Sequence, residues 1–165
     1  MVGGTTGAVA CALAAAKSGL RVFLVECHNF LGEDICSTLR LIRHPDQTIP
    51  LHPLGYELFD EKGCTTPARV KGVLSRRLME TRIPILFGTC ITDIVRDSQG
   101  RLCGVLVANR AGRQAIRARA VVDATDYAWI ARRIGCEREP WGGGCVRFER
   151  SSIRVSSGGE WAVQT

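Results

Sequence analysis

The residues best suited to chemistry stand at the start of the chain, in a glycine-rich turn that consists of Gly3, Gly4, Thr5, Thr6, Gly7 and Ala8. Glycines leave the backbone open, so a pyrophosphate can approach its N–H groups closely. A helix that starts directly after such a turn adds free N–H groups and a positive dipole end, which favour an anion. The stretch therefore predicts a nucleotide-binding turn.

The turn fits a G-x-G-x-x-G/A fingerprint in two registers, with either Gly7 or Ala8 at the third conserved position. With Ala8 there, Gly3 is the first glycine and Thr5 replaces the middle one. We prefer this register because Glu26 then follows Ala8 by 26 − 8 = 18 residues. That is near the spacing of about 20 for an acid that binds a ribose hydroxyl. The alternative is a plain loop before an alanine-rich helix, because short glycine motifs also arise by chance.

Several elements must position this turn. Small residues predict a slim helix after the turn that stops at Gly19, followed by an apolar strand over residues 22–25 that ends at Glu26. Residues 66–82 have helical spacing, with Thr66 as the N-cap, and one apolar stripe consists of Val70, Val73, Leu74 and Leu78. Residues 84–88 then predict a short buried strand.

Three short strands over residues 90–96, 102–109 and 114–118 are separated by turn sequences, which predicts an antiparallel meander. Residues 120–123 form a last apolar strand, and a helix that begins near Trp129 ends at Gly135. Ligands of open α/β sheets bind beyond the carboxyl ends of the strands. We therefore expect the turn after residue 123 to share one crevice with Glu26.

These motifs resemble those of the FAD-dependent oxidoreductases, in particular a bacterial group whose first turn reads GGTT or GGTP. The resemblance continues in Phe30-Leu31-Gly32, which is similar to a segment beside FAD in those enzymes, and in residues 121–125, which look like their late DATG strand. It covers about residues 1–138. Asp126 departs from the family pattern, since it stands where the second motif usually has a glycine.

The resemblance implies a set of cofactor-binding residues beyond the first turn and Glu26. It places the backbone near Ile91 against adenine and the chain after Glu26 along the cofactor, where Arg40, Arg43 and His44 are the polar candidates to face phosphate or substrate. A solvated basic loop is an equally good interpretation of those three residues. The remaining implied contacts are Gly32, Ala124, Thr125 and Asp126.

The implied fold is α/β, a Rossmann-like FAD-binding domain with a parallel sheet and the inserted three-stranded meander. Residues 1–138 would form this domain, and residues 139–165 a linker and the start of a truncated second, substrate domain. Only Met1 and Val2 precede the turn, whereas a strand of about five residues is usual there. We therefore expect a fragment with its first strand truncated, which leaves strand edges unpaired.

The net charge is 22 − 16 = +6, but no aromatic platform or nucleic-acid motif accompanies the arginines, so we expect no nucleic-acid partner. The eight cysteines include no C-x-x-C pair, and the three histidines complete no zinc spacing. We expect no bound metal and mostly buried, reduced thiols, with Cys11 acting as a small hydrophobe in the first helix. Reduced thiols favour a reducing, cytoplasmic compartment. No apolar run is long enough to span a membrane.

The sequence thus predicts the FAD-binding portion of an oxidoreductase that passes hydride between a small-molecule substrate and flavin. The portion itself would be inactive. Two alternatives remain open: an NAD(P)-binding Rossmann domain, which has no need of the meander, and a nucleotide-binding module without catalysis. No residue pattern identifies a catalytic group.

Overall fold

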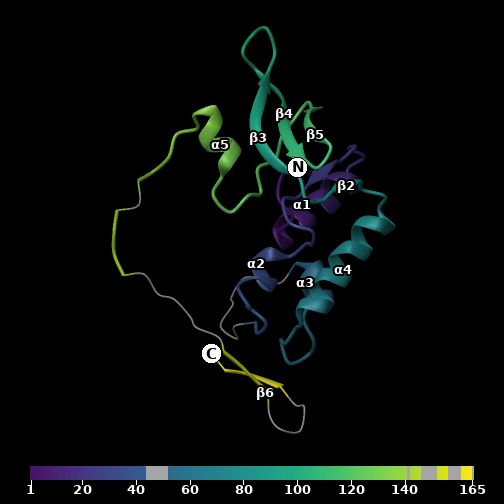
Figure 1. Cartoon of the computed structure of the whole chain (residues 1–165). Coiled ribbons are helices and arrows are strands. Elements are labelled where there is room, and N and C mark those ends of the chain that lie inside the picture. The colour runs from purple at the N-terminus through teal and green to yellow at the C-terminus, as the bar shows by residue number, and fades with distance from the viewer. Residues whose placement is uncertain (44–51, 141, 146–151, 156–160, 165) are drawn as a thin grey trace.

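The computed structural model describes residues 1–43, 52–140, 142–145, 152–155 and 161–164 (Figure 1). The helices are α1 (Thr6–Lys17), α2 (Glu33–Cys36), α3 (Pro53–Leu58), α4 (Pro67–Glu80) and α5 (Trp129–Ile134). The strands are β1 (Leu24–Val25), β2 (Ile85–Leu86), β3 (Cys90–Arg96), β4 (Leu102–Asn109), β5 (Gly112–Arg117), β6 (Ser152–Val155) and β7 (Trp161–Gln164). In the part of the chain so described, no helix combines the length and the apolar character needed to cross a membrane.

A short parallel layer lies at the centre of the fold. β1 and β2 pair in parallel, and Val2 forms parallel bridges with Val25 on one side and Asp123 on the other. The Gly3 N–H donates to the Val25 carbonyl at 2.9 Å, and the Val2 N–H donates to the Val122 carbonyl at 3.0 Å. The glycine turn therefore leaves the middle of the layer.

The predicted parallel strands exist but are shorter than expected. Residues 22–25 and 84–88 each contribute a strand of two residues, and residues 120–123 contribute only the bridge at Asp123. The antiparallel meander agrees more closely with its prediction. β3 and β4 have the expected bounds, and β5 begins two residues before the expected start at 114.

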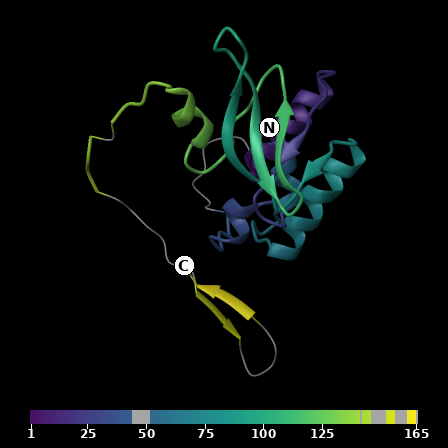
Figure 2. The same ribbon diagram turned by 45° about the horizontal axis from the view of Figure 1, so that its top comes forward.

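Alternate residues of the parallel layer pack against different cores. Leu24 belongs to a buried cluster with residues of α1, α3 and α4, whereas its neighbour Val25 packs with Val2 and with Val105 and Val107 of the meander. Successive strand residues point to opposite faces of a sheet, so helices α1 to α4 cover one face, and the meander and α5 cover the other. Figures 1 and 2 show the meander and the helix group α2 to α4 on different sides of the N-terminus.

Helix α4 forms as its sequence predicted. The Thr66 hydroxyl caps it by accepting from the Arg69 N–H at 3.2 Å, and a proline follows at the first helical position. The expected stripe of Val70, Val73, Leu74 and Leu78 is buried, where it packs against the slim α1. The helix ends at Glu80, two residues before the predicted limit of 82.

Two short helices, α2 and α3, occur where the sequence lacked clear periodicity, and α5 ends at Gly135 as expected. One prediction about packing is wrong: Cys11 is exposed on α1, so it is not a core residue. Beyond residue 138, β6 and β7 pair with each other in an antiparallel hairpin that the sequence had not indicated.

Gly32 provides a direct test of how tightly α2 packs on α4. Its φ is +78°, and a Cβ there would lie 2.5 Å from Val70 Cγ1. Gly19 has a similar φ of +81° but open space around it. A left-handed alanine costs about 1–2 kcal/mol, and overpacking adds about 1–3 kcal/mol.

We therefore expect Gly32→Ala to lower the free energy of unfolding by about 2–5 kcal/mol, measured by urea denaturation. Gly19→Ala is the matched control, with only the backbone cost. Equal losses in the two variants would show that α2 does not pack on α4 as described.

Candidate functional site

A cleft of about 320 Å³ opens where the glycine turn, the end of β1, the start of β3 and the turn after Asp123 meet. Eight of the predicted site residues line it: Gly3, Gly4, Thr5, Glu26, Ile91, Ala124, Thr125 and Asp126. These residues come from four segments far apart in the sequence. The predicted convergence of Glu26 with the turn after Asp123 is therefore present in the fold.

The other predicted site residues lie outside the lining of this cleft. Thr6, Gly7 and Ala8 belong to the first turn of α1, where Ala8 is buried. Gly32 is buried between Gly4 and α4, and its N–H donates to the Gly4 carbonyl at 2.8 Å. Arg40 is exposed. Of its two predicted companions, Arg43 is exposed with its N–H bonded to the Gly63 carbonyl, and His44 lies outside the described residues.

A larger hollow of about 640 Å³ lies elsewhere on the molecule, beside the turn between β3 and β4. Arg101, Arg117 and Arg119 contribute to its wall. It contains none of the residues that the sequence singled out. The smaller cleft is therefore the candidate site.

Gly3 and Gly4 form the floor of the cleft in a way that excludes side chains. Gly3 has a φ of +98°, and a Cβ on it would lie 2.4 Å from the Ala124 carbonyl oxygen. A Cβ on Gly4 would lie 2.6 Å from Glu26 Oε2. The two glycines are thus required because three chain segments approach one another at this point.

The N-terminus of α1 shows why Thr5 replaces the middle glycine of the fingerprint. Its hydroxyl caps the helix by accepting from the Ala8 N–H at 3.1 Å. Asp34 adds a second cap, since its carboxylate accepts from the Thr6 N–H at 2.9 Å and from the Thr6 hydroxyl. Asp34 could not be predicted as a cap, because nothing in the spacing of residues 6 and 34 indicates that they meet.

The turn keeps backbone donors for a ligand. Within the described residues, no protein acceptor meets the N–H groups of Gly4 and Thr5, both in the cleft wall. Such free N–H groups beside a helix start are suited to phosphate oxygens. The site is therefore suited to bind a pyrophosphate through the two unpaired N–H groups of Gly4 and Thr5.

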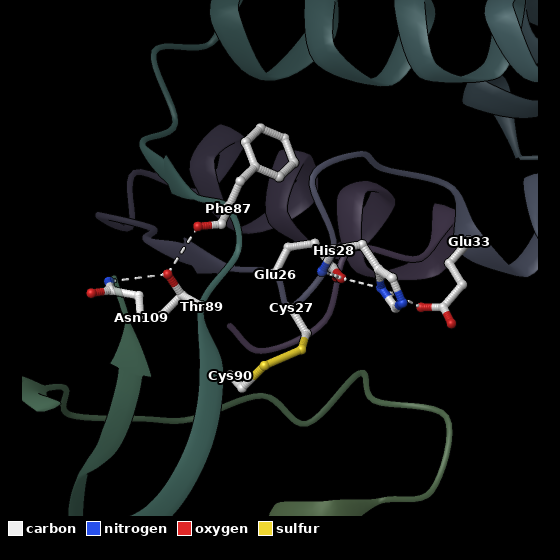
Figure 3. The surroundings of a disulfide bond; sticks show 8 residues. All are labelled: Glu26, Cys27, His28, Glu33, Phe87, Thr89, Cys90 and Asn109. Carbon is white, nitrogen blue, oxygen red and sulfur yellow. Dashed lines mark hydrogen bonds and ion pairs between the residues drawn. A yellow bond between two sulfur atoms is a disulfide. The ribbon is translucent and has the colours of Figure 1, made fainter. Parts of the chain in front are cut away.

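Glu26 is buried, with only 3% of its surface exposed. Its Oε1 accepts from the His28 N–H at 2.6 Å and lies 2.7 Å from His28 Nδ1. The same Nδ1 lies 3.0 Å from Glu33 Oε2, as Figure 3 shows. His28 therefore bridges two carboxylates, and it orients Glu26 in the cleft. His28 and Glu33 were not among the predicted site residues, because the glycine fingerprint says nothing about the residues that contact Glu26.

Negative charge gathers on this side of the cleft. Loss of hydration on burial is the main cause of the raised pKa of Glu33, and the charges of Asp126, Glu26 and Asp34 raise it further, while His28 lowers it. A ligand with phosphate groups would add to the repulsion. Burial and the neighbouring carboxylates thus disfavour the charged form of Glu33 in the cleft wall.

Asp123 holds the second turn together. One oxygen accepts from the Thr125 N–H at 3.1 Å and from its hydroxyl at 2.7 Å. The other accepts from the Ile130 and Ala131 N–H groups at 2.7 and 3.0 Å. Burial opposes the charge of Asp123, but these hydrogen bonds outweigh it and lower the pKa of the carboxyl. The turn and the start of α5 are therefore fixed by one carboxylate.

A disulfide joins Cys27 to Cys90 in the cleft wall (Figure 3). The expectation of reduced, mostly buried thiols is therefore wrong. These two cysteines are paired, and of the six free cysteines only Cys36 is buried. The pair is separated by 63 positions, so no local spacing could reveal it. The fold brings the pair together by placing the end of β1 beside the start of β3.

Comparison with known proteins agrees with this geometry. The sequence model of the family described as FAD dependent oxidoreductase matches residues 1–142. No curated protein matches the chain. The resemblance seen in the sequence is thereby confirmed, and it extends a few residues beyond the expected limit of 138.

Three solved structures share this fold and are distant in sequence. THI4 of Thermovibrio ammonificans is 19% identical, with a TM-score of 0.60 over 81% of this chain and 59% of that chain. A geranylgeranyl bacteriochlorophyll reductase-like protein of Thermoplasma acidophilum is 17% identical, with a TM-score of 0.59 over 82% of this chain and 41% of that chain. L-proline dehydrogenase of P. horikoshii is 14% identical, with a TM-score of 0.58 over 84% of this chain and 55% of that chain.

These likenesses confirm the predicted α/β, Rossmann-like fold with its inserted meander. The chain spans 59% or less of the length of each of these three structures.

The network around Asp123 leads to a pH-dependent prediction. A carboxyl whose folded pKa is lowered contributes stability that is present above its unfolded pKa, about 3.9, and is lost as the pH falls through the folded pKa. Asp123→Asn removes hydrogen bonds to a charged acceptor, each worth about 1.5–3 kcal/mol. We expect a loss of at least that size at pH 7.

The stability difference between wild type and Asp123→Asn should shrink below about pH 4, measured by urea denaturation at several pH values. Asp93→Asn is the control, because Asp93 pairs with Arg133 at the surface and should matter less. A difference between Asp123→Asn and wild type that does not change with pH would contradict a charged Asp123 as the organiser of the turn.

Proposed function

The chain belongs to the family of FAD-dependent oxidoreductases, whose cofactor is FAD, and from this premise we propose that the cleft holds the ADP half of that cofactor. One observation carries the proposal. The unpaired N–H groups of Gly4 and Thr5 and the buried carboxylate of Glu26 face the same cleft. An ADP group carries phosphates and ribose hydroxyls close together. Its phosphates need hydrogen-bond donors, and its ribose hydroxyls need an acceptor such as a carboxylate.

The residues divide the recognition between them. Within the turn from Gly3 to Ala8, the N–H groups of Gly4 and Thr5 bind the pyrophosphate, and the dipole of α1 favours its negative charge. Glu26 accepts hydrogen bonds from the adenosine ribose, and His28 holds its carboxylate in position. Ile91 gives the adenine an apolar neighbour on β3. Ala124, Thr125 and Asp126 close the opposite wall.

When bound, FAD supplies the redox chemistry by accepting or donating hydride at its flavin ring. The chain's own residues bind and orient the dinucleotide, and the protein passes hydride between a small-molecule substrate and the cofactor. Residues 1–138 form the FAD-binding domain, and residues 139–165 lead into a region that contributes the substrate site. The chain spans 59% or less of the length of the three solved structures, and we propose that it turns over no substrate alone. A cytoplasmic location also remains a proposal.

The bound nucleotide is the direct test of this function. We expect the purified protein to show a flavin absorbance spectrum, or to acquire one when FAD is added. Heat denaturation should then release FAD into solution, where chromatography identifies it. Release of NAD instead, or release of nothing from a folded protein that also fails to take up FAD, would contradict the proposal.

The two glutamates that flank His28 should respond in opposite ways. Glu26→Gln removes charge from the ribose acceptor and should weaken FAD binding about 10- to 150-fold, the equivalent of about 1.5–3 kcal/mol. Glu33→Gln removes a charge that repels phosphate and should leave the affinity unchanged or raise it. Titration calorimetry of the apoprotein with FAD measures both dissociation constants.

Glu80→Ala, on the solvent side of α4, is the control for a general effect of losing a carboxylate. If Glu33→Gln weakened FAD binding as much as Glu26→Gln, the assignment of the ribose to Glu26 would fall.

A further inference from the structure

The disulfide between Cys27 and Cys90 occupies a particular place in the fold. Cys27 directly follows Glu26, and Cys90 directly precedes Ile91, so the bond lies between the proposed ribose acceptor and the proposed neighbour of adenine. Figure 3 shows the bond crossing from the end of β1 to the start of β3. The Cα atoms of the pair are 4.6 Å apart. The bond thus ties together the two segments that would form the adenosine end of the site.

Hydrogen bonds also join these two segments. The Thr89 N–H donates to the Glu26 carbonyl and the Gly88 N–H to the His28 carbonyl, both at 3.0 Å. The buried Thr89 is further tied to β4, because the Asn109 side chain donates to its hydroxyl at 3.2 Å. These contacts all precede Cys90 on that segment. At the point where β3 turns into the cleft wall, the disulfide is the covalent restraint.

The pair is also accessible to reductants. Cys27 and Cys90 are both exposed, and exposed disulfides are the ones that thiols reach and reduce. The other six cysteines are free, three of them exposed on the described surface. A disulfide framework of the kind found in small secreted proteins would pair most of its cysteines. A single exposed bond among free thiols fits a reversible pair better than a permanent staple.

We propose that Cys27 and Cys90 form a reversible redox latch that sets the affinity of the cleft for FAD. This rests on the proposed function, because it places adenosine between the two segments. In the oxidised state the latch holds the end of β1 and the start of β3 in the binding geometry before the cofactor arrives. Such preorganisation lowers the entropy cost of ordering these two segments when FAD binds.

The reductant is a dithiol. Its thiolate attacks one sulfur of the Cys27–Cys90 bond, which breaks the bond and gives a mixed disulfide, while the other cysteine leaves as a thiolate and takes up a proton. The second thiol of the reductant then displaces the first cysteine, which also leaves as a thiol. In total, two electrons and two protons pass to the cysteines, and the dithiol becomes a cyclic disulfide. The two sulfurs no longer stay at bonding distance, so the adenosine end of the cleft loosens.

The test compares FAD affinity in the oxidised and reduced protein. The apoprotein is equilibrated with defined ratios of reduced and oxidised dithiothreitol, the free thiols are counted, and FAD is titrated at each ratio by flavin fluorescence. We expect six free thiols in the oxidised form and eight in the reduced form, from the one disulfide and six free cysteines. The dissociation constant for FAD should rise about three- to tenfold on reduction, with the same midpoint as the thiol count.

Variants separate the latch from a general effect of reduction. Cys27→Ser/Cys90→Ser should bind FAD like the reduced wild type at every ratio. Cys136→Ser, which removes an exposed free cysteine, should keep the full redox response. Hydrogen exchange of the amides in residues 88–91 should rise on reduction in wild type and Cys136→Ser.

The proposal fails if eight thiols are free under oxidising conditions, or if FAD binds equally well to both forms of the wild type. It fails also if the double variant keeps the redox response. Absence of FAD binding in both redox states is a different outcome, since it contradicts the proposed function itself and the latch with it.

Discussion

The whole site depends on close packing around Gly3 and Gly4, which leaves no space for a side chain at either residue. Three chain segments meet there, and a Cβ on either glycine would lie within 2.6 Å of Ala124 or Glu26 atoms. This close approach brings the N-terminus of α1, the end of β1 and the turn after Asp123 to one cleft. With larger residues the segments would separate, and the backbone donors and the carboxylate would no longer face the same ligand. The glycines thus determine the relative position of every other group in the site.

The carboxylates around this junction are held in place by the hydrogen-bond donors that contact them. Asp34 caps α1, and Asp123 fixes the second turn through four hydrogen bonds, so each is held by backbone donors of its own chain. Glu26 is held by His28 but remains in the cleft wall. An acidic residue near a phosphate site is therefore compatible with anion binding where its charge is already compensated. Glu33 also contacts His28, but its burial and its carboxylate neighbours still raise its pKa.

Local patterns in the sequence were enough for the helices and strands that have strong periodicity or turn chemistry. The α4 stripe and the meander are of this kind, because their apolar spacing and turn residues lie within one short stretch of sequence. Contacts between distant segments could not be predicted. The pairing of Cys27 with Cys90, the Asp34 cap on Thr6 and the His28 bridge to Glu33 all follow from how the segments pack. For the same reason, Gly32 was interpreted as a cofactor contact although it serves the packing of α2 on α4.

The most direct test of this account is a crystal structure of the protein grown with FAD. The account predicts that the pyrophosphate lies within hydrogen-bonding distance of the Gly4 and Thr5 N–H groups and that the adenosine ribose lies on the Glu26 carboxylate. FAD bound elsewhere, for example in the hollow beside Arg101 and Arg117, or a ribose turned away from Glu26, would contradict it.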